Sequence, residues 1–352
     1  MGIFFQQMSF EIRNPIVVTF TEQRLKELLR NCIGKRIAVV GDLMVDSYYW
    51  GNVSRVSPEA PVPVVDVVSE SVRLGGAANV ANNIQALGGE PVLVGLIGND
   101  HPGEMFLKIL KEQNLSAEGI VTDMSRPTTI KTRVIAHGQH VVRIDNESKT
   151  DCPEELQHRI IDAVKYKIHN IDAIILEDYN KGVVTKSIIH EIIAVARKYE
   201  KVVTADPKLN NFFEYKNVTV FKPNKREAEE AIGSRIRTND EVIRAGEKML
   251  AELHADNVLL TRGEEGLSLF ERNGEISHMK SVAANVQDVS GAGDTVISTL
   301  TMALVSGATI REAAALANCA ASVVVGAVGI VPIQPDQLLA SALRLTNHSG
   351  GL

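Results

Sequence analysis

The chain has 352 residues, with 37 basic and 43 acidic side chains and a net charge of −6. This acidic excess argues against a nucleic-acid-binding protein, which usually presents a basic face, and 45% hydrophobic with 23% charged residues excludes a disordered chain. Cys32, Cys152 and Cys319 are too far apart for a zinc site or a disulfide framework, which fits a reducing compartment. No apolar run reaches the roughly 18 residues of a membrane-spanning helix, so we expect a cytoplasmic protein.

The first predicted elements follow an N-terminal tail at residues 1–20. Thr21 can cap a helix with the sequence TEQRLKELLRNC, and Arg36–Asp42 (RIAVVGD) is a continuous apolar run typical of a buried parallel strand. Further runs of this kind alternate with helical patterns: PVLVGLIG, DAIILED, KVVTADP, VTVFKPN and NVLLTRG. This alternation predicts an α/β fold with a largely parallel central sheet and helices on both faces.

Two stretches, Gly51–Gly76 and Thr128–Ser148, are rich in β-formers and have little helical pattern. The second predicts a hairpin that turns at His137–His140. We interpret both as a small β-sheet lid, inserted at about 47–73 and 127–148 into one domain that spans residues 21–346, with a C-terminal tail at 347–352. Prolines in the first stretch favour an edge strand or an interface arm.

A glycine-rich turn opens a helix near the C-terminus, in DVSGAGDTVISTLTMAL (Asp288–Leu304). Small residues there expose backbone N–H groups at the helix N-terminus, an arrangement that binds anions. A carboxylate beside such a site, Asp294, is suited to act as a general base or a metal contact. The spacing fits neither a Walker A loop nor a dinucleotide-binding fingerprint. The structural alternative is a turn in which Asp294 merely offsets the helix dipole.

Other polar motifs lie at the ends of predicted strands or of the lid. They are Gly75–Ala81, Asp206-Pro207-Lys208, Phe221–Glu227 and Thr261-Arg262-Gly263. Open α/β sheets bind ligands at the carboxyl ends of their strands. We therefore expect these motifs to meet the Asp294 turn in one site.

Together these motifs make the chain resemble the PfkB/ribokinase family of carbohydrate kinases over about residues 33–345. The family signatures correspond to Gly75–Ala81 and Asp288–Leu300. Ser57–Val64, within GDLMVDSYYWGNVSRVSPEAPVPVV, and the following GGAANVANNIQALGG resemble the branch that phosphorylates D-glycero-β-D-manno-heptose 7-phosphate to the 1,7-bisphosphate, in ADP-heptose and lipopolysaccharide core synthesis. The resemblance implies a ribokinase-like fold with ATP and Mg²⁺ as cofactors. Activation by a monovalent cation occurs in the family, and the sequence does not decide it.

The resemblance also implies roles for single residues. Asp294 would take the proton of the anomeric hydroxyl, at an ordinary pKa near 3.9, while the N–H groups of Gly291, Ala292 and Gly293 form an anion hole. Asn224 and Glu227 match the N-x-x-E motif and would orient water around Mg²⁺. The same spacing is that of a capping box, and both roles can hold together.

For the nucleotide, Thr261 and Gly263 resemble phosphate contacts, and Asn318 resembles a position near adenine. A solvated or capping asparagine is the alternative for Asn318. The expected sugar contacts are Asp42, Asp46, Gly75, Gly76, Asn79, Arg143, Asp145 and Lys181. Lys181 is assigned to the 7-phosphate, with Arg55 as the alternative. We interpret Arg143, Asp145 and Glu147 as sharing one face of a strand.

The chain departs from the pattern at Glu177-Asp178, where close relatives tend to have Ser-Asp. Those relatives often carry a fused adenylyltransferase domain, whose motifs are missing here, so the sequence predicts a monofunctional form or a part of such a fusion. Two alternatives stay open: a PfkB kinase for a ketohexose phosphate or ribose, and a non-catalytic sugar-binding regulator. Expected partners are a sugar phosphate and a second copy bound through the lid, and neither nucleic acid nor membrane.

Overall fold

Two β-sheets organise the chain, and the larger one forms the body. A computed structural model describes residues 18–283, 286–327 and 329–348, so most of the predicted tails lies outside the described residues. The strand order of the body sheet is β13-β12-β11-β10-β9-β8-β1-β4-β5. Its strands are β1 (Arg36–Gly41), β4 (Glu90–Gly98), β5 (Gly119–Asp123), β8 (Ala173–Glu177), β9 (Val202–Asp206), β10 (Val220–Phe221), β11 (Asn257–Thr261), β12 (Leu267–Glu271) and β13 (Ile276–Met279).

All neighbouring strands from β11 to β5 are parallel, which confirms the predicted sheet. The antiparallel pair β12–β13 at the other edge was not predicted. The chain leaves β1 toward β4 on one side and returns as β8 on its other side. The ends of β1 and β8 therefore flank the crevice where an open α/β sheet binds its ligands.

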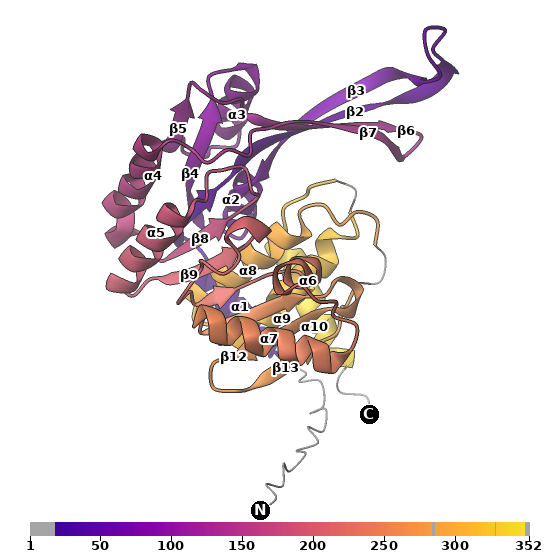
Figure 1. The fold of residues 1–352 in the computed structure, drawn as a ribbon. Helices are drawn as coiled ribbons and strands as arrows, with labels where there is room; N and C mark the ends of the chain where they lie inside the picture. The colour runs from indigo at the N-terminus through magenta and orange to yellow at the C-terminus, as the bar shows by residue number, and fades with distance from the viewer. Residues whose placement is uncertain (1–17, 284–285, 328, 349–352) are drawn as a thin grey trace, which may run out of the picture.

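The second sheet is the lid. Its order is β3-β2-β6-β7, built from β2 (Leu43–Val56), β3 (Pro63–Gly76), β6 (Thr129–Ala136) and β7 (Gln139–Asn146). Figure 1 shows the β2–β3 hairpin reaching far beyond the body. The β6–β7 hairpin turns at His137-Gly138, and the proline-bearing β3 is an edge strand; both were predicted.

Helices cover both faces of the body sheet. They are α1 (Glu22–Asn31), α2 (Ala77–Ala86), α3 (His101–Glu112), α4 (Glu154–Lys167), α5 (Lys186–Lys198), α6 (Lys225–Ile232), α7 (Asn239–Leu253), α8 (Ala292–Val305), α9 (Ile310–Val324) and α10 (Pro335–His348), with 3₁₀ turns at Ile168–Asn170, Leu209–Asn211 and Gly263–Glu265. Within the described ranges, no helix combines the length and apolarity needed to cross a membrane.

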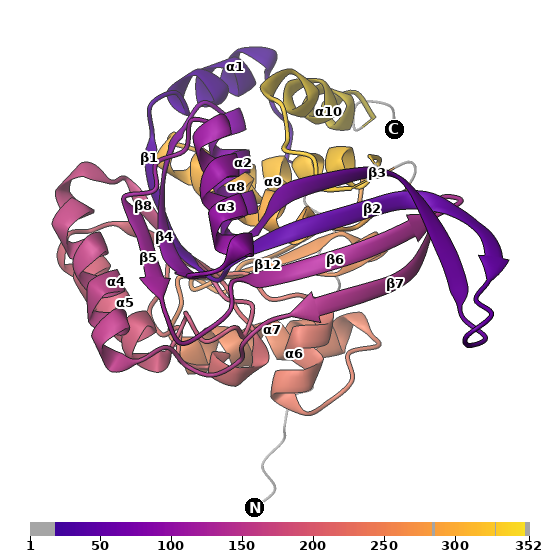
Figure 2. The ribbon, with the colours of Figure 1, turned by 90° about the horizontal axis from the view of Figure 1, so that it is seen from above.

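Alternating residues of β1 feed two cores. Ile37 and Val39 join the core under α1, α2, α8, α9 and α10, whereas Ala38 and Val40 join the core under α4, α5 and α7. This alternation is the expected consequence of the strand period of two. Figure 2 shows α1 and α10 side by side at one edge of the body.

Asp42 follows β1 and holds the loop that follows β8. Its Oδ2 accepts hydrogen bonds from the N–H groups of Tyr179 (2.7 Å) and Lys181 (3.1 Å), and its Oδ1 accepts one from Val183 (3.1 Å). The side chain is fully buried. Asp42 therefore has a structural role in shaping this loop, and its contact with sugar stays a prediction.

Asp178 is a second buried carboxylate in this loop. It accepts hydrogen bonds from the N–H of Asn180 and the hydroxyl of Tyr215, both at 2.7 Å. Burial, followed by the nearby charge of Asp42, raises the pKa of Asp178 to about 7. The folded protein therefore holds a proton there that the unfolded chain releases near pH 4.

This proton links stability to pH. Between pH 4 and pH 7 the folded state binds more protons than the unfolded state, so the raised pKa of Asp178 makes stability fall as pH rises. We expect wild type to lose about 2 kcal/mol more unfolding free energy than Asp178→Asn between pH 5 and pH 8. Urea unfolding at both pH values measures the difference. Asp172→Asn, at the solvent-accessible opposite end of β8, is the control, and parallel behaviour of Asp178→Asn and wild type would contradict the assignment.

Candidate active site

Asp294 lies in the first turn of α8, beneath the lid, and is 4% exposed. Its Oδ2 accepts a hydrogen bond from Asn79 Nδ2, and its Oδ1 accepts one from the hydroxyl of Tyr179, both at 2.6 Å. Asn79 was predicted in the site, whereas Tyr179 was not. The two donors come from α2 and from the loop after β8, and each fixes one oxygen of the carboxylate.

Burial raises the pKa of Asp294, opposed by the two hydrogen bonds. The expected ordinary pKa near 3.9 is therefore wrong, because the pKa of Asp294 lies above it. Both donors are neutral groups, so they orient the carboxylate without neutralising its charge. A raised pKa brings a carboxylate closer to the range in which a general base works well at neutral pH.

The turn before α8 differs in part from the predicted anion hole. Gly291 has a left-handed backbone (φ 76°) and is the N-cap residue, with no side chain capping the helix. The N–H of Ala292 donates to the carbonyl of Val289 at 3.2 Å, so this group is already engaged in a turn. The helix N-terminus at Gly291 and Gly293 still offers backbone donors beside Asp294.

Three further buried charges surround Asp294. Asp206 and Lys222 lie in motifs that were expected in this site, but neither they nor Glu177 had been given a role. Lys222, which follows β10, donates to Asp206 Oδ2 at 2.8 Å. One carboxylate oxygen each of Glu177, Asp206 and Asp294 lies within 4.8 Å of the other two. Burial, then the charges of Asp206 and Asp294, raise the pKa of Glu177 well above its usual value. The sequence signal was the position of all three residues at strand ends.

Asn224 and Glu227 form a capping box at the start of α6. Asn224 Oδ1 accepts from the N–H of Glu227 (2.9 Å), and Glu227 Oε2 accepts from the N–H of Asn224 (2.8 Å). Glu227 Oε1 also accepts from Lys208 Nζ at 2.5 Å. The capping interpretation is confirmed. The remaining lone pairs of the Glu227 carboxylate can still accept hydrogen bonds from water molecules.

The predicted nucleotide residues lie at neighbouring strand ends. Thr261 ends β11 and forms a bridge to Asn224, and Gly263 opens a 3₁₀ turn. Asn318 lies buried on α9, where its Nδ2 donates to the carbonyl of Lys280 at 2.7 Å. The alternative of a solvated or capping Asn318 is therefore wrong.

The predicted sugar residues of the lid belong to a network of ion pairs. Arg143 pairs with Asp145, and Lys131 bridges Asp145 and Glu147. Glu147 also binds Lys181 of the body at 2.8 Å. The assignment of Lys181 to the 7-phosphate is weakened, because its ammonium group already has a partner.

Asp46 faces the body from β2 and pairs with Arg133 of β6. Arg133 and Arg73 lie over the ring of Tyr48, with guanidinium carbons 5.2 and 5.5 Å from its centroid. Gly75 and Gly76 end β3 and lead directly into α2, which carries Asn79. The lid therefore contributes both charged side chains and the backbone that positions Asn79.

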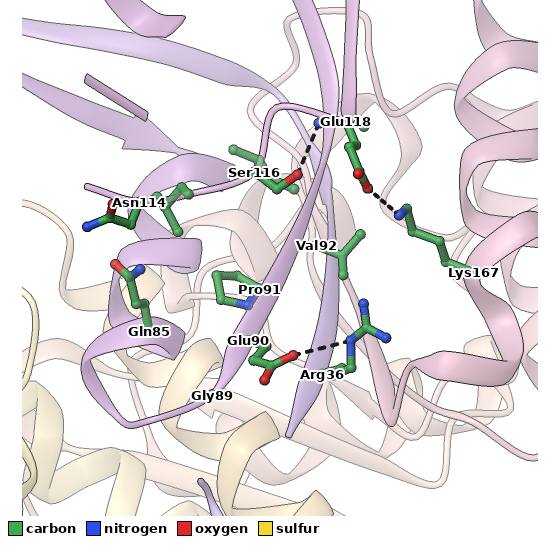
Figure 3. A pocket seen from close by; sticks show the side chains of 13 residues that line it. Arg36, Gln85, Gly89, Glu90, Pro91, Val92, Asn114, Ser116, Glu118 and Lys167 are labelled. Carbon is green, nitrogen blue, oxygen red and sulfur yellow. Dashed lines mark hydrogen bonds and ion pairs between the residues drawn. The ribbon is translucent and has the colours of Figure 1, made fainter. Parts of the chain in front are cut away.

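A separate hollow of about 260 Å³ lies at the opposite, amino edge of β1, β4 and β5 (Figure 3). Its charged groups are paired with each other, Arg36 with Glu90 at 3.4 Å and Lys167 with Glu118 at 2.7 Å. This hollow has no carboxylate cluster or helix N-terminus like those at Asp294. We therefore place the candidate active site at the carboxyl edge.

Comparison with known proteins shows what the chain is similar to. Residues 35–337 match the family described as pfkB family carbohydrate kinase. The bifunctional protein HldE of Geobacter sulfurreducens is 44% identical over 303 residues, which cover 86% of this chain and 62% of that protein. The protein of the same name from Helicobacter pylori is 42% identical, covering 84% of this chain and 64% of the relative. The chain thus spans somewhat less than two thirds of the length of these curated relatives.

Solved structures share the fold. Arabidopsis thaliana ribokinase complexed with ribose and ATP has a TM-score of 0.68 at 20% identity, covering 88% of this chain and 99% of that one. Escherichia coli phosphofructokinase-2 in complex with potassium has a TM-score of 0.73 at 18% identity, covering 89% and 99%. At these identities the likeness shows the ribokinase-like fold alone. The family match over 303 residues shows more: the chain belongs to the pfkB family of carbohydrate kinases.

Proposed function

We propose that the protein transfers the γ-phosphoryl group of ATP to the anomeric hydroxyl of D-glycero-β-D-manno-heptose 7-phosphate, producing the 1,7-bisphosphate for ADP-heptose and lipopolysaccharide core synthesis. The observation that carries the chemistry is Asp294, buried and oriented by Asn79 and Tyr179 at the N-terminus of α8. The choice of sugar is supported by the resemblance at Ser57–Val64 and by the identity to the two HldE proteins.

In the proposed reaction the anomeric oxygen attacks the γ-phosphorus as its proton passes to Asp294. The O–H bond of the sugar breaks, a new O–P bond forms, and the bond to the β-phosphate breaks to release ADP. Asn79 and Tyr179 keep the carboxylate turned toward the sugar, and the raised pKa of Asp294 favours proton uptake. Backbone donors at Gly291 and Gly293 would stabilise charge on the transferring group.

Nucleotide binding is proposed for the neighbouring strand ends. Thr261 and Gly263 would contact phosphates, and Asn318 would lie near adenine. Asn224 and Glu227 would hold Mg²⁺ through water, which suits a carboxylate whose oxygens already accept two hydrogen bonds. Mg²⁺ would neutralise charge on the phosphates. Dependence on a monovalent cation stays a prediction.

Substrate choice is tested with a coupled ADP-release assay containing ATP and Mg²⁺. The panel is the heptose 7-phosphate, fructose 6-phosphate, fructose 1-phosphate and ribose. We expect turnover of the heptose phosphate at a kcat/KM well above that of the others. Preference for a ketose phosphate or ribose would overturn the sugar assignment and keep the kinase assignment. Sugar binding with no turnover on any member would favour the non-catalytic regulator.

The base assignment is tested in the same assay with Asp294→Asn. The amide keeps the size of the side chain but cannot take the proton, so kcat should fall by about 10²- to 10⁴-fold. Asp172→Asn, at the opposite edge of the sheet, is the matched control and should retain wild-type kcat. If Asp294→Asn keeps kcat within a few-fold of wild type, another group is the base.

We also propose that two copies pair through the lid. Residues opposite one another on paired strands share a face, so Tyr49, Val134 and Val142 lie on one face with Ile144. Val142 is 48% exposed and Ile144 57% exposed. The other face carries Asp46 and its charged neighbours toward the body. An exposed apolar face on an extended sheet is typical of a protein interface.

The lid contact is tested by light scattering coupled to size-exclusion chromatography. Wild type should have the mass of a dimer, and the double variant Val142→Glu/Ile144→Glu should have the mass of a monomer because it places charge on the apolar face. Tyr166→Glu alters a residue that is 86% exposed on α4 and should leave the mass unchanged. A wild-type monomer, or a double variant that stays dimeric, would contradict a dimer formed through this face.

A further inference from the structure

Glu177 is a buried carboxylate for which the proposed reaction has no use. It ends β8 and is fully buried. Both Oε1 and Oε2 lack a hydrogen-bond partner among the described residues. A buried carboxylate without donors is costly, because it has lost water and gained nothing in return. Such a group in the centre of a site calls for a ligand that the protein alone does not supply.

The side chain points into a cluster rather than into an apolar core. One oxygen each from Glu177, Asp206 and Asp294 lies within 4.8 Å of the other two. The three residues come from the ends of β8 and β9 and from the first turn of α8, which are rigid elements. Three carboxylate oxygens that converge in this way form a set of hard ligands.

The charges of this region do not balance. Six charged side chains are buried or largely buried here: Glu177, Asp206, Lys208, Lys222, Glu227 and Asp294. Lys222 pairs with Asp206, and Lys208 pairs with Glu227. Asp294 has only neutral donors, and Glu177 has none. With all six groups ionised, two negative charges are left over, which equals the charge of one divalent cation; without a cation, burial and the charges of Asp206 and Asp294 raise the pKa of Glu177 instead.

We propose that Glu177, Asp206 and Asp294 hold a divalent cation by direct carboxylate ligation, and that they do so without nucleotide. This site differs from the water-mediated Mg²⁺ contact assigned to Asn224 and Glu227, and it does not depend on which sugar is phosphorylated. Oxygen ligands of this kind suit Mg²⁺ or Mn²⁺.

The test uses Mn²⁺ alone with the full chain, free of nucleotide and sugar. Isothermal titration calorimetry and electron paramagnetic resonance count the bound ions. We expect one Mn²⁺ per chain in wild type and about tenfold or more weaker binding in Glu177→Gln. Glu90→Gln, at the amino edge of the sheet, should bind as wild type does. Glu227→Gln should weaken binding less than Glu177→Gln does, because Glu227 is not a proposed ligand, although its pairing with Lys208 enters the charge balance.

Glu177→Ser provides a second variant in case glutamine disturbs the fold, and circular dichroism checks folding of each protein. It too should lose Mn²⁺ affinity. No stoichiometric Mn²⁺ binding by wild type would overturn the proposal. Unchanged Mn²⁺ affinity in Glu177→Gln would also overturn it, and would indicate that Glu177 is a protonated acid. A loss of affinity confined to Glu227→Gln would overturn it as well, because it would place the ion at the N-x-x-E motif. Because neither nucleotide nor sugar is present, the result is independent of the sugar-kinase assay.

Discussion

Each carboxylate at the carboxyl edge of the parallel sheet needs a partner, and this constraint shapes the rest of the site. Parallel strands bring their ends to one edge, so Asp42, Glu177 and Asp206 lie in the same buried layer. The chain satisfies them differently. Asp42 accepts three backbone N–H groups and thereby shapes a loop, whereas Asp206 is neutralised by Lys222. Backbone donors build structure, while an ion pair sets the local charge.

The lid follows from a similar constraint on its two faces. A long hairpin such as β2–β3 is marginally stable alone, so each face needs something to pack on. The charged face meets the body through Lys131, Glu147 and Lys181, and through Arg73, which donates to the carbonyl of Ile330. The apolar face joins the body core at its base, through Val45, Leu74 and Ile130, and its outer part is exposed at Val142 and Ile144. A second copy of the lid would bury it, and this gives the proposed dimer a physical reason.

Local patterns predicted much of the fold because strand–helix alternation and β-rich stretches are properties of contiguous sequence. The β12–β13 hairpin was missed although Asn273-Gly274 between two apolar runs is a hairpin signal. Contacts between distant residues could not be derived. Tyr179 reaches Asp294 across 115 positions, and Asp42 binds N–H groups 137 to 141 positions away. The sequence shows that Asp42 is acidic and lies near a strand end. It does not show that three backbone N–H groups donate hydrogen bonds to the carboxylate of Asp42.

Around Asp294, different residues neutralise charge and orient the base: Lys222 neutralises a neighbouring carboxylate, while neutral donors orient Asp294. Had Lys222 paired with Asp294, that carboxylate would have had a permanent positive partner within the protein. Lys222 pairs with Asp206 instead, and Asp294 receives an amide and a phenol, which hold its direction and leave its charge in place. A buried base of this kind keeps its charge uncompensated until a ligand arrives. The unpartnered Glu177 beside it adds to the same field, so the site attracts a cation and the proton of a hydroxyl group.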